Sequence, residues 1–148
     1  MENRLCNEDL ERAVSLLKEN EAFTCVLVKG EEVYTSDAHG VRALLGWLRE
    51  GKDLEGFSSA DRIVGKAAAL LYIKMGIRAI HACTISEAAE TVLEGNDISF
   101  SYDDRVLQIL NRDGSDMCPM EKAVKDTDDP GRAPDLLLEA VKAMSARK

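Results

Sequence analysis

The stretch from Ser58 to Leu93 constrains the fold more than any other part of the 148-residue chain. Its first half, SSADRIVGKAAALLYIKMG, has hardly any polar face when it is read at helical spacing. A helix that is apolar nearly all round is packed on more than one side. Ser58 with Asp61 three residues later fits a capping box, and Gly76 suits the residue that ends a helix. We therefore predict a buried central helix that ends at Gly76.

A row of mostly small side chains runs along this predicted helix. Gly65, Ala68, Ala69 and Tyr72 follow the i, i+3, i+4, i+7 spacing, which allows close approach of a sheet. The next segment, IRAIHACTIS, is a short apolar run typical of a buried strand. EAAETVLEGN then predicts a helix closed by Gly95, and ISFSYDD alternates like a half-exposed strand. The centre of the chain thus predicts a helix followed by a strand–helix–strand unit.

The flanking segments add a hairpin and shorter helices. A first helix capped by Asn7 precedes AFTCVLVKGEEVYTS, which indicates two strands that turn at Lys29-Gly30 and end at His39-Gly40. VRALLGWLREG predicts a short amphipathic helix, VLQILNRDGSDM fits either an extended segment or a helical turn, and CPMEKAV and PDLLLEAVKAM predict the last helices. We expect one α/β domain over residues 1–148, a three-layer α/β/α sandwich with a mixed sheet that starts with a β-hairpin.

Charge and hydropathy exclude some classes of partner. The net charge of −8 argues against a protein that binds the phosphate backbone of nucleic acids, although a small anion can still bind locally at a helix N-terminus. No apolar run reaches the roughly 18 residues of a membrane span, and MENRLCNEDL carries no leader pattern. We expect a cytoplasmic homo-oligomer with neither nucleic acid nor membrane as a partner.

The cysteines are spaced too widely for a conventional zinc motif. The chain has no C-x-x-C pair among its four cysteines, Cys6, Cys25, Cys83 and Cys118. We therefore expect free thiols, with Cys25 and Cys83 buried. His81 and Cys83 share one face of a strand, and Cys118 could approach them. Three scattered ligands rarely form a zinc site, and a core histidine with two buried thiols is the favoured interpretation.

Three strings of the sequence carry a family resemblance. DRIVGKAAALL, HACTISEAAETVL and NRDGSDMCPMEKAV resemble those of a small uncharacterised prokaryotic family that is assigned to the cytidine-deaminase-like fold superfamily. The resemblance extends over roughly Ala22 to Val124. It implies a cytidine-deaminase-like arrangement of the hairpin, the buried helix and the strand–helix–strand unit.

The chain departs from the zinc deaminases at the residues that perform their chemistry. Those enzymes carry His-x-Glu at the start of the central helix and Pro-Cys-x-x-Cys at the start of the next. Here no His, Cys or Glu occurs from Ile63 to Met75, and the second motif retains Cys83 but has Ser86 in place of the other cysteine. We therefore expect no zinc-dependent deamination, no metal and no cofactor.

The resemblance also predicts where a ligand would bind. It places the ligand cleft where the central helix and the following helix begin, so Lys66, Cys83, Ser86 and Cys118 are expected around one pocket. Lys66 could contact a phosphate or a carbonyl group, or it could be a surface lysine with a buried stem. Ser86 could present helical N–H groups to an anion, or it could be an ordinary N-cap.

Two acidic residues and a polar cluster complete the candidate site. Asp61 is either the capping-box partner or an acceptor for a ribose hydroxyl. Glu121 lies within capping reach of Cys118, which is either a buried thiol or a nucleophile at a helix start. The segment Asn111 to Asp113 directly precedes this helix, and the sequence leaves open whether it borders the cleft.

Three functions follow from these residues. The favoured one is a metal-free deaminase-like domain that binds a nucleotide or related phosphorylated small molecule in a regulatory role. The second is an enzyme with remodelled, non-zinc chemistry that uses Lys66 or Cys118. The third is a self-associating scaffold without catalysis, whose interface would include Trp47 on an outer amphipathic helix.

Overall fold

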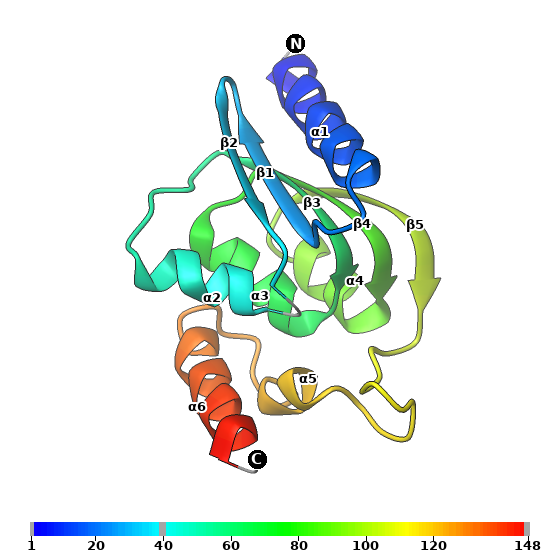
Figure 1. Ribbon diagram of the computed structural model, residues 1–148, viewed down its shortest axis with the longest axis vertical. Coiled ribbons are helices and arrows are strands. Elements are labelled where there is room, and N and C mark those ends of the chain that lie inside the picture. Colours follow the sequence, from blue (N-terminus) through cyan, green and yellow to red (C-terminus); the bar gives the residue numbers. More distant parts are fainter. Residues whose placement is uncertain (1, 39–40, 147–148) are drawn as a thin grey trace.

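The computed structural model describes residues 2–38 and 41–146, and within them the side chains of 8–38 and 41–145. Helices and strands alternate through the middle of the chain (Figure 1). The helices are α1 (Glu2–Glu19), α2 (Arg42–Arg49), α3 (Lys66–Met75), α4 (Glu87–Glu94), α5 (Pro119–Ala123) and α6 (Ala133–Ala146). The strands are β1 (Cys25–Lys29), β2 (Glu32–Ser36), β3 (Ser58–Val64), β4 (Ala79–Ser86) and β5 (Ser99–Val106).

The strands form one mixed sheet in the order β2-β1-β3-β4-β5. The β1–β2 hairpin is antiparallel, and β1 also pairs antiparallel with β3, which brings Cys25 opposite Asp61. Strands β3, β4 and β5 run parallel to one another. The crossovers through α3 and α4 each bring the chain back to the same end of the sheet before the next strand begins. The carboxyl ends of these three strands therefore lie at the same end of the sheet, on the side of α5 (Figure 1).

Helices cover both faces of this sheet. On one face α1 packs Ala13 and Leu17 against Val26, Val28 and Ala60. On the other face α2 to α6 pack over a larger core, to which α3 contributes a nearly continuous buried surface (Figure 1). The predicted three-layer α/β/α sandwich with a mixed sheet and an initial hairpin is therefore confirmed.

The predicted start of the central helix is wrong. SSADRIV forms β3 and not a first helical turn, so Ser58 and Asp61 make no capping box. Gly65 is the N-cap of α3 rather than a member of the small row, and the helix begins at Lys66. SSADRIV mixes polar and apolar residues over only seven positions, and so short a segment fits a strand or a helical turn equally well. Pairing with β1 on one side and β4 on the other settles the conformation.

Other boundaries agree with the sequence more closely. α3 ends at Gly76 with φ of 76°, and Gly95 caps α4, as predicted. α1 already begins at Glu2, so Asn7 lies inside the helix and is not its N-cap. The ambiguous segment forms a loop closed by a bridge between Leu110 and Met117. The predicted break at residues 39–40 lies outside the described residues.

Trp47 is part of the core and not of an exposed face. It is 8% exposed, and its ring lies 6.4 Å from that of Tyr34. The expectation that Trp47 belongs to an outer interface is therefore wrong. Of the helices in residues 2–38 and 41–146, none combines the length and the apolar content that crossing a bilayer requires.

Candidate functional site

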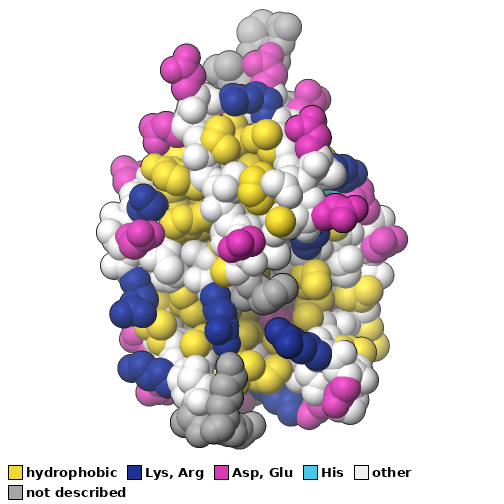
Figure 2. Space-filling view, in the orientation of Figure 1, with side chains coloured by type: hydrophobic (Ala, Val, Ile, Leu, Met, Phe, Trp, Pro, Cys, Tyr) yellow, Lys and Arg dark blue, Asp and Glu magenta, His cyan; other side chains and the backbone are white. Residues whose placement is uncertain are grey.

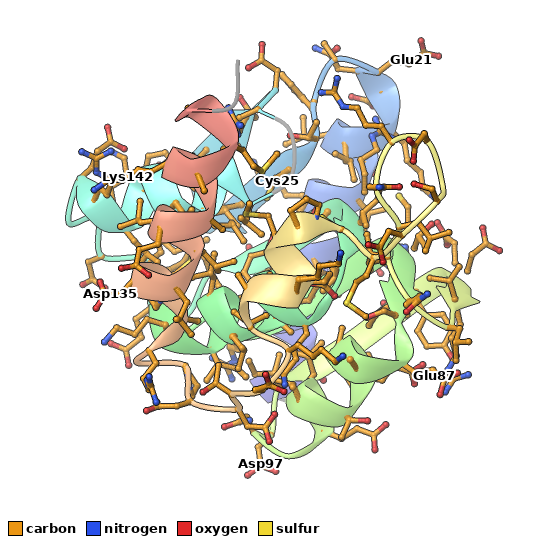
Figure 3. The ribbon with its side chains drawn as sticks, turned by 90° about the horizontal axis from the view of Figure 1, so that it is seen from below. Glu21, Cys25, Glu87, Asp97, Asp135 and Lys142 are labelled. Atoms are coloured by element: carbon orange, nitrogen blue, oxygen red, sulfur yellow. The ribbon has the colours of Figure 1, made fainter. Side chains whose placement is uncertain are left out.

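A cavity of about 990 Å³ lies where β3 ends and α3 begins. Asp61 and Ile63 of β3 form part of its wall, together with Ala67 and Ala68 at the start of α3. Residues 109–113, α5, the start of α2 and the end of α6 complete it. Seen from below in Figure 3, α5 and α6 lie over this end of the molecule, and Cys25 lies in the interior. Segments that are distant in sequence thus converge on one hollow.

A buried polar network stands behind one wall of the cavity. The Tyr72 hydroxyl donates a hydrogen bond of 2.6 Å to Asp61 Oδ2 and accepts one of 2.8 Å from Ser59 Oγ. The Cys25 sulfur lies 3.2 Å from the same hydroxyl. Tyr72 and Ser59 are fully buried, whereas Asp61 is half-buried and reaches the cavity. The network therefore fixes the carboxylate of Asp61 at the cavity wall.

Burial changes the proton affinity of this network. It raises the pKa of Asp61 to about 6, against a smaller lowering by the hydrogen bond from Tyr72. Burial and the neighbouring Asp61 charge also raise the pKa values of the Cys25 thiol and the Tyr72 hydroxyl. Because Cys25 and Tyr72 stay protonated at neutral pH, Asp61 is the member of the network that can exchange a proton there.

A second carboxylate closes the N-terminus of α3. Glu121 Oε1 and Oε2 accept hydrogen bonds of 2.8 Å each from the backbone N–H groups of Lys66 and Ala67. Glu121 is 8% exposed, and burial raises its pKa although the two N–H groups oppose the shift. The prediction that Glu121 serves the start of its own helix beside Cys118 is wrong. An acid from α5 instead satisfies the helix that a bound anion would otherwise use.

Lys66 does not line the cavity, in contrast to the sequence prediction. Its ammonium group lies 2.9 Å from Asp128 Oδ1 and donates to the carbonyl of Lys125 at 3.2 Å. The difference arises because α3 begins at Lys66 and not near the predicted capping box of Ser58 and Asp61. Its side chain therefore meets the connector after α5 rather than the cavity.

Cys83 and Ser86 also lie elsewhere. Cys83 packs beneath α1 on the opposite face of the sheet, where burial raises the pKa of its thiol. Ser86 is buried and is the N-cap of α4, and its hydroxyl accepts a hydrogen bond of 3.2 Å from the N–H of Ala89. The ordinary N-cap interpretation of Ser86 is thus confirmed, and neither Cys83 nor Ser86 lines the cavity at the start of α3.

The cavity unites three of the six predicted site residues with others that were not predicted. Asp61, Cys118 and Glu121 line it, and so does the polar cluster from Asn111 to Asp113. Sequence reasoning missed Arg42 at the start of α2 and the supporting hydroxyl of Tyr72. The sequence feature that could have revealed the role of Tyr72 is the alternation of Ser59, Asp61 and Ile63. Read as a strand, this segment places Ser59 and Asp61 on the face toward α3, the helix that carries Tyr72.

Potential metal ligands remain dispersed. In the part of the chain that the structure describes, no group of three or more His, Cys, Asp or Glu side chains could hold a metal ion. His81 bonds through Nδ1 to Ser101 Oγ at 2.7 Å, on the α1 side of the sheet. Cys118 lies at the cavity on the other side. Cys25, Cys83 and Cys118 are free thiols, and the side chain of Cys6 lies outside the described residues.

A known family model covers most of the chain. The family model of DUF1893, a domain of unknown function, matches residues 12–141. The chain belongs to the DUF1893 family. That match includes β3, α3 and α5, so the cavity residues contributed by these elements lie within the family domain.

Solved structures extend the comparison. A DUF1893 family crystal structure, TM1506 from Thermotoga maritima, is 32% identical with a TM-score of 0.79, over 88% of this chain and 89% of that one. A diaminohydroxyphosphoribosylaminopyrimidine deaminase/5-amino-6-(5-phosphoribosylamino)uracil reductase from the same organism is 17% identical with a TM-score of 0.42, over 70% of this chain and 37% of that one. Among curated proteins, none matched.

Proposed function

We propose that this DUF1893 protein binds a nucleotide or a related phosphorylated small molecule in the cavity between β3, α3 and α5. The observation that carries the proposal is the cavity itself, which joins apolar walls to a few converging polar groups. Its volume of about 990 Å³ is at the upper end of the roughly 300–1,000 Å³ of ligand sites. Ile63, Ala68 and Met120 offer a surface for a flat ring.

Two arginines that line the cavity support the proposal of a phosphorylated ligand. Arg42 and Arg112 are exposed and belong to the lining. In Figure 2, Lys and Arg side chains gather on the lower half of the molecule, the region of α2 and α6 in Figure 1. A guanidinium group matches phosphate geometry through paired N–H donors. The protein thus offers local positive charge despite a net charge of −8.

The other predicted functions receive less support. Chemistry through Lys66 is disfavoured because the ammonium group is committed to Asp128 and Lys125, away from the cavity. Cys118 lines the cavity, but no base is hydrogen-bonded to it among the described contacts. A regulatory role and homo-oligomerisation stay proposals, since the arrangement of a single chain does not depend on either.

Replacing both arginines should weaken nucleotide binding. We expect Arg42→Ala/Arg112→Ala to bind a nucleoside 5′-monophosphate at least about tenfold more weakly, because a charge-assisted contact is worth roughly 1.5–3 kcal/mol. Affinity for the matching nucleoside without its phosphate should change little. Isothermal calorimetry with AMP, GMP, IMP, CMP and UMP, and with their nucleosides, measures both effects.

Arg49→Ala and Lys66→Ala are the matched controls. Arg49 lies on α2 and Lys66 on α3, but neither side chain lines the cavity, so both variants should keep the parent affinity. Failure of the parent protein to bind any of the five nucleotides would refute the proposal. A loss of affinity in Lys66→Ala equal to that of the double variant would place the phosphate elsewhere.

A further inference from the structure

The charged side chains that line the cavity differ in burial. Asp61 is half-buried and Glu121 is buried, whereas Arg42 and Arg112 are exposed, so the carboxylates define a buried end and the arginines an outer one. A third arginine, Arg62, directs its guanidinium group away, to the carbonyls of Leu17, Phe23 and Asn20. The cations that remain for a ligand are therefore the exposed Arg42 and Arg112.

The buried end is unsuited to an anion. Glu121 already occupies the N–H groups of Lys66 and Ala67, so a phosphate there would meet a carboxylate of like charge instead of helical donors. The Tyr72 hydroxyl uses its single proton in the bond to Asp61, so it is no donor to a ligand either. A group that enters this end must donate hydrogen bonds rather than accept them.

Asp61 has a defined capacity for such a group. Its Oδ2 accepts from the hydroxyl of Tyr72 at 2.6 Å, and its Oδ1 accepts from the N–H of Ile63 at 3.3 Å. Each carboxylate oxygen has two lone pairs, so one acceptor position remains on each. Two parallel acceptors side by side match two adjacent N–H donors, as in a guanidine, an amidine or the N1/N2 edge of guanine.

We infer that Asp61 is the specificity-determining residue of the cavity and that it selects a ligand whose inner end carries two adjacent N–H donors, with guanine as the representative base. This inference rests on the proposed function, and it adds the orientation of the ligand: the donor-bearing ring lies at Asp61, and the phosphate lies at Arg42 and Arg112. Tyr72 is a positioning residue, because it holds the carboxylate without contacting the ligand.

GMP and IMP form the matched pair of probes, because they differ only by the 2-amino group of the base. We expect GMP to bind the full chain at least about tenfold more tightly, since IMP offers Asp61 one N–H donor where GMP offers two. Asp61→Asn replaces one acceptor by a donor and should abolish the preference, because an amide pairs as well with the N1–H and O6 of inosine. Calorimetry with both ligands measures the ratio of dissociation constants.

Asp53→Asn is the control, since Asp53 is an exposed carboxylate outside the cavity that accepts a hydrogen bond from the N–H of Glu55. It should retain the preference of the parent for GMP. Equal binding of GMP and IMP by the parent would overturn the inference and leave the proposed function standing. A preference that persists in Asp61→Asn would overturn the role of Asp61, and no binding to any nucleotide would overturn both. Thermal unfolding of each variant verifies that it is folded.

Discussion

Gly65→Val is expected to lower the free energy of unfolding by about 2–4 kcal/mol. A Cβ atom at residue 65 would lie 2.3 Å from Glu121 Oε1 and 2.5 Å from its Cδ, so the carboxylate would have to move. Its movement would remove both acceptors from the N–H groups of Lys66 and Ala67. It would also leave a buried charge without its hydrogen bonds. The backbone of Gly65, with φ of −100°, imposes no such demand by itself.

Ser99→Val provides the matched control, because Ser99 is exposed on the edge strand β5. Its effect should stay within about 0.5 kcal/mol. Urea denaturation of both variants and of Glu121→Ala measures the difference. If Gly65→Val acts through Glu121, its cost should fall strongly in the Glu121→Ala background. Equal stability of the Gly65 and Ser99 variants, or full additivity in the double variant, would contradict this explanation.

The sequence predicted those elements whose signals are local. Glycine at position 76 ends α3 in the left-handed conformation, and Ser86 caps α4 through its own hydroxyl. Each of these features depends on residues within one helical turn, so a single sequence contains the information. The alternation around Cys25 and Leu27 likewise identified β1 and its hairpin. The three-layer arrangement follows from the order of such elements.

Features that depend on distant partners were not predictable in the same way. β3 resembles the start of a helix until β1 and β4 are paired with it. Glu121 caps a helix that begins 55 residues earlier, and nothing in its own surroundings reveals this partner. The different place of Lys66 follows from the same misassigned boundary, because as the first residue of α3 it lies beside the connector after α5 and bonds to Asp128 and Lys125.

The free energy of unfolding should depend on pH through the ionisation of Asp61. The unfolded carboxyl has a pKa of 3.8 and the folded one a pKa of about 6, so between these values the folded state binds more protons than the unfolded state. The contribution of Asp61 is therefore fully present below pH 3.8 and is lost as the pH rises through 6. Two pKa units correspond to about 3 kcal/mol at most. The raised pKa of Glu121 acts with the same sign.

Asp61→Asn should consequently be more stable than the parent at pH 7, whereas the two should differ little at pH 4. The amide still accepts the hydrogen bond of Tyr72 but carries no buried charge. Urea denaturation of both proteins from pH 4 to pH 8 gives the difference in their free energies of unfolding, in which the contributions of other groups cancel.

Asp113→Asn should show no such gain, because Ser115 lowers the pKa of that exposed carboxyl. A parent that exceeds Asp61→Asn in stability at pH 7 would mean that the Asp61 charge stabilises the fold. Residues that lower stability are typical of functional sites, so the same measurement bears on the proposed role of Asp61 in binding.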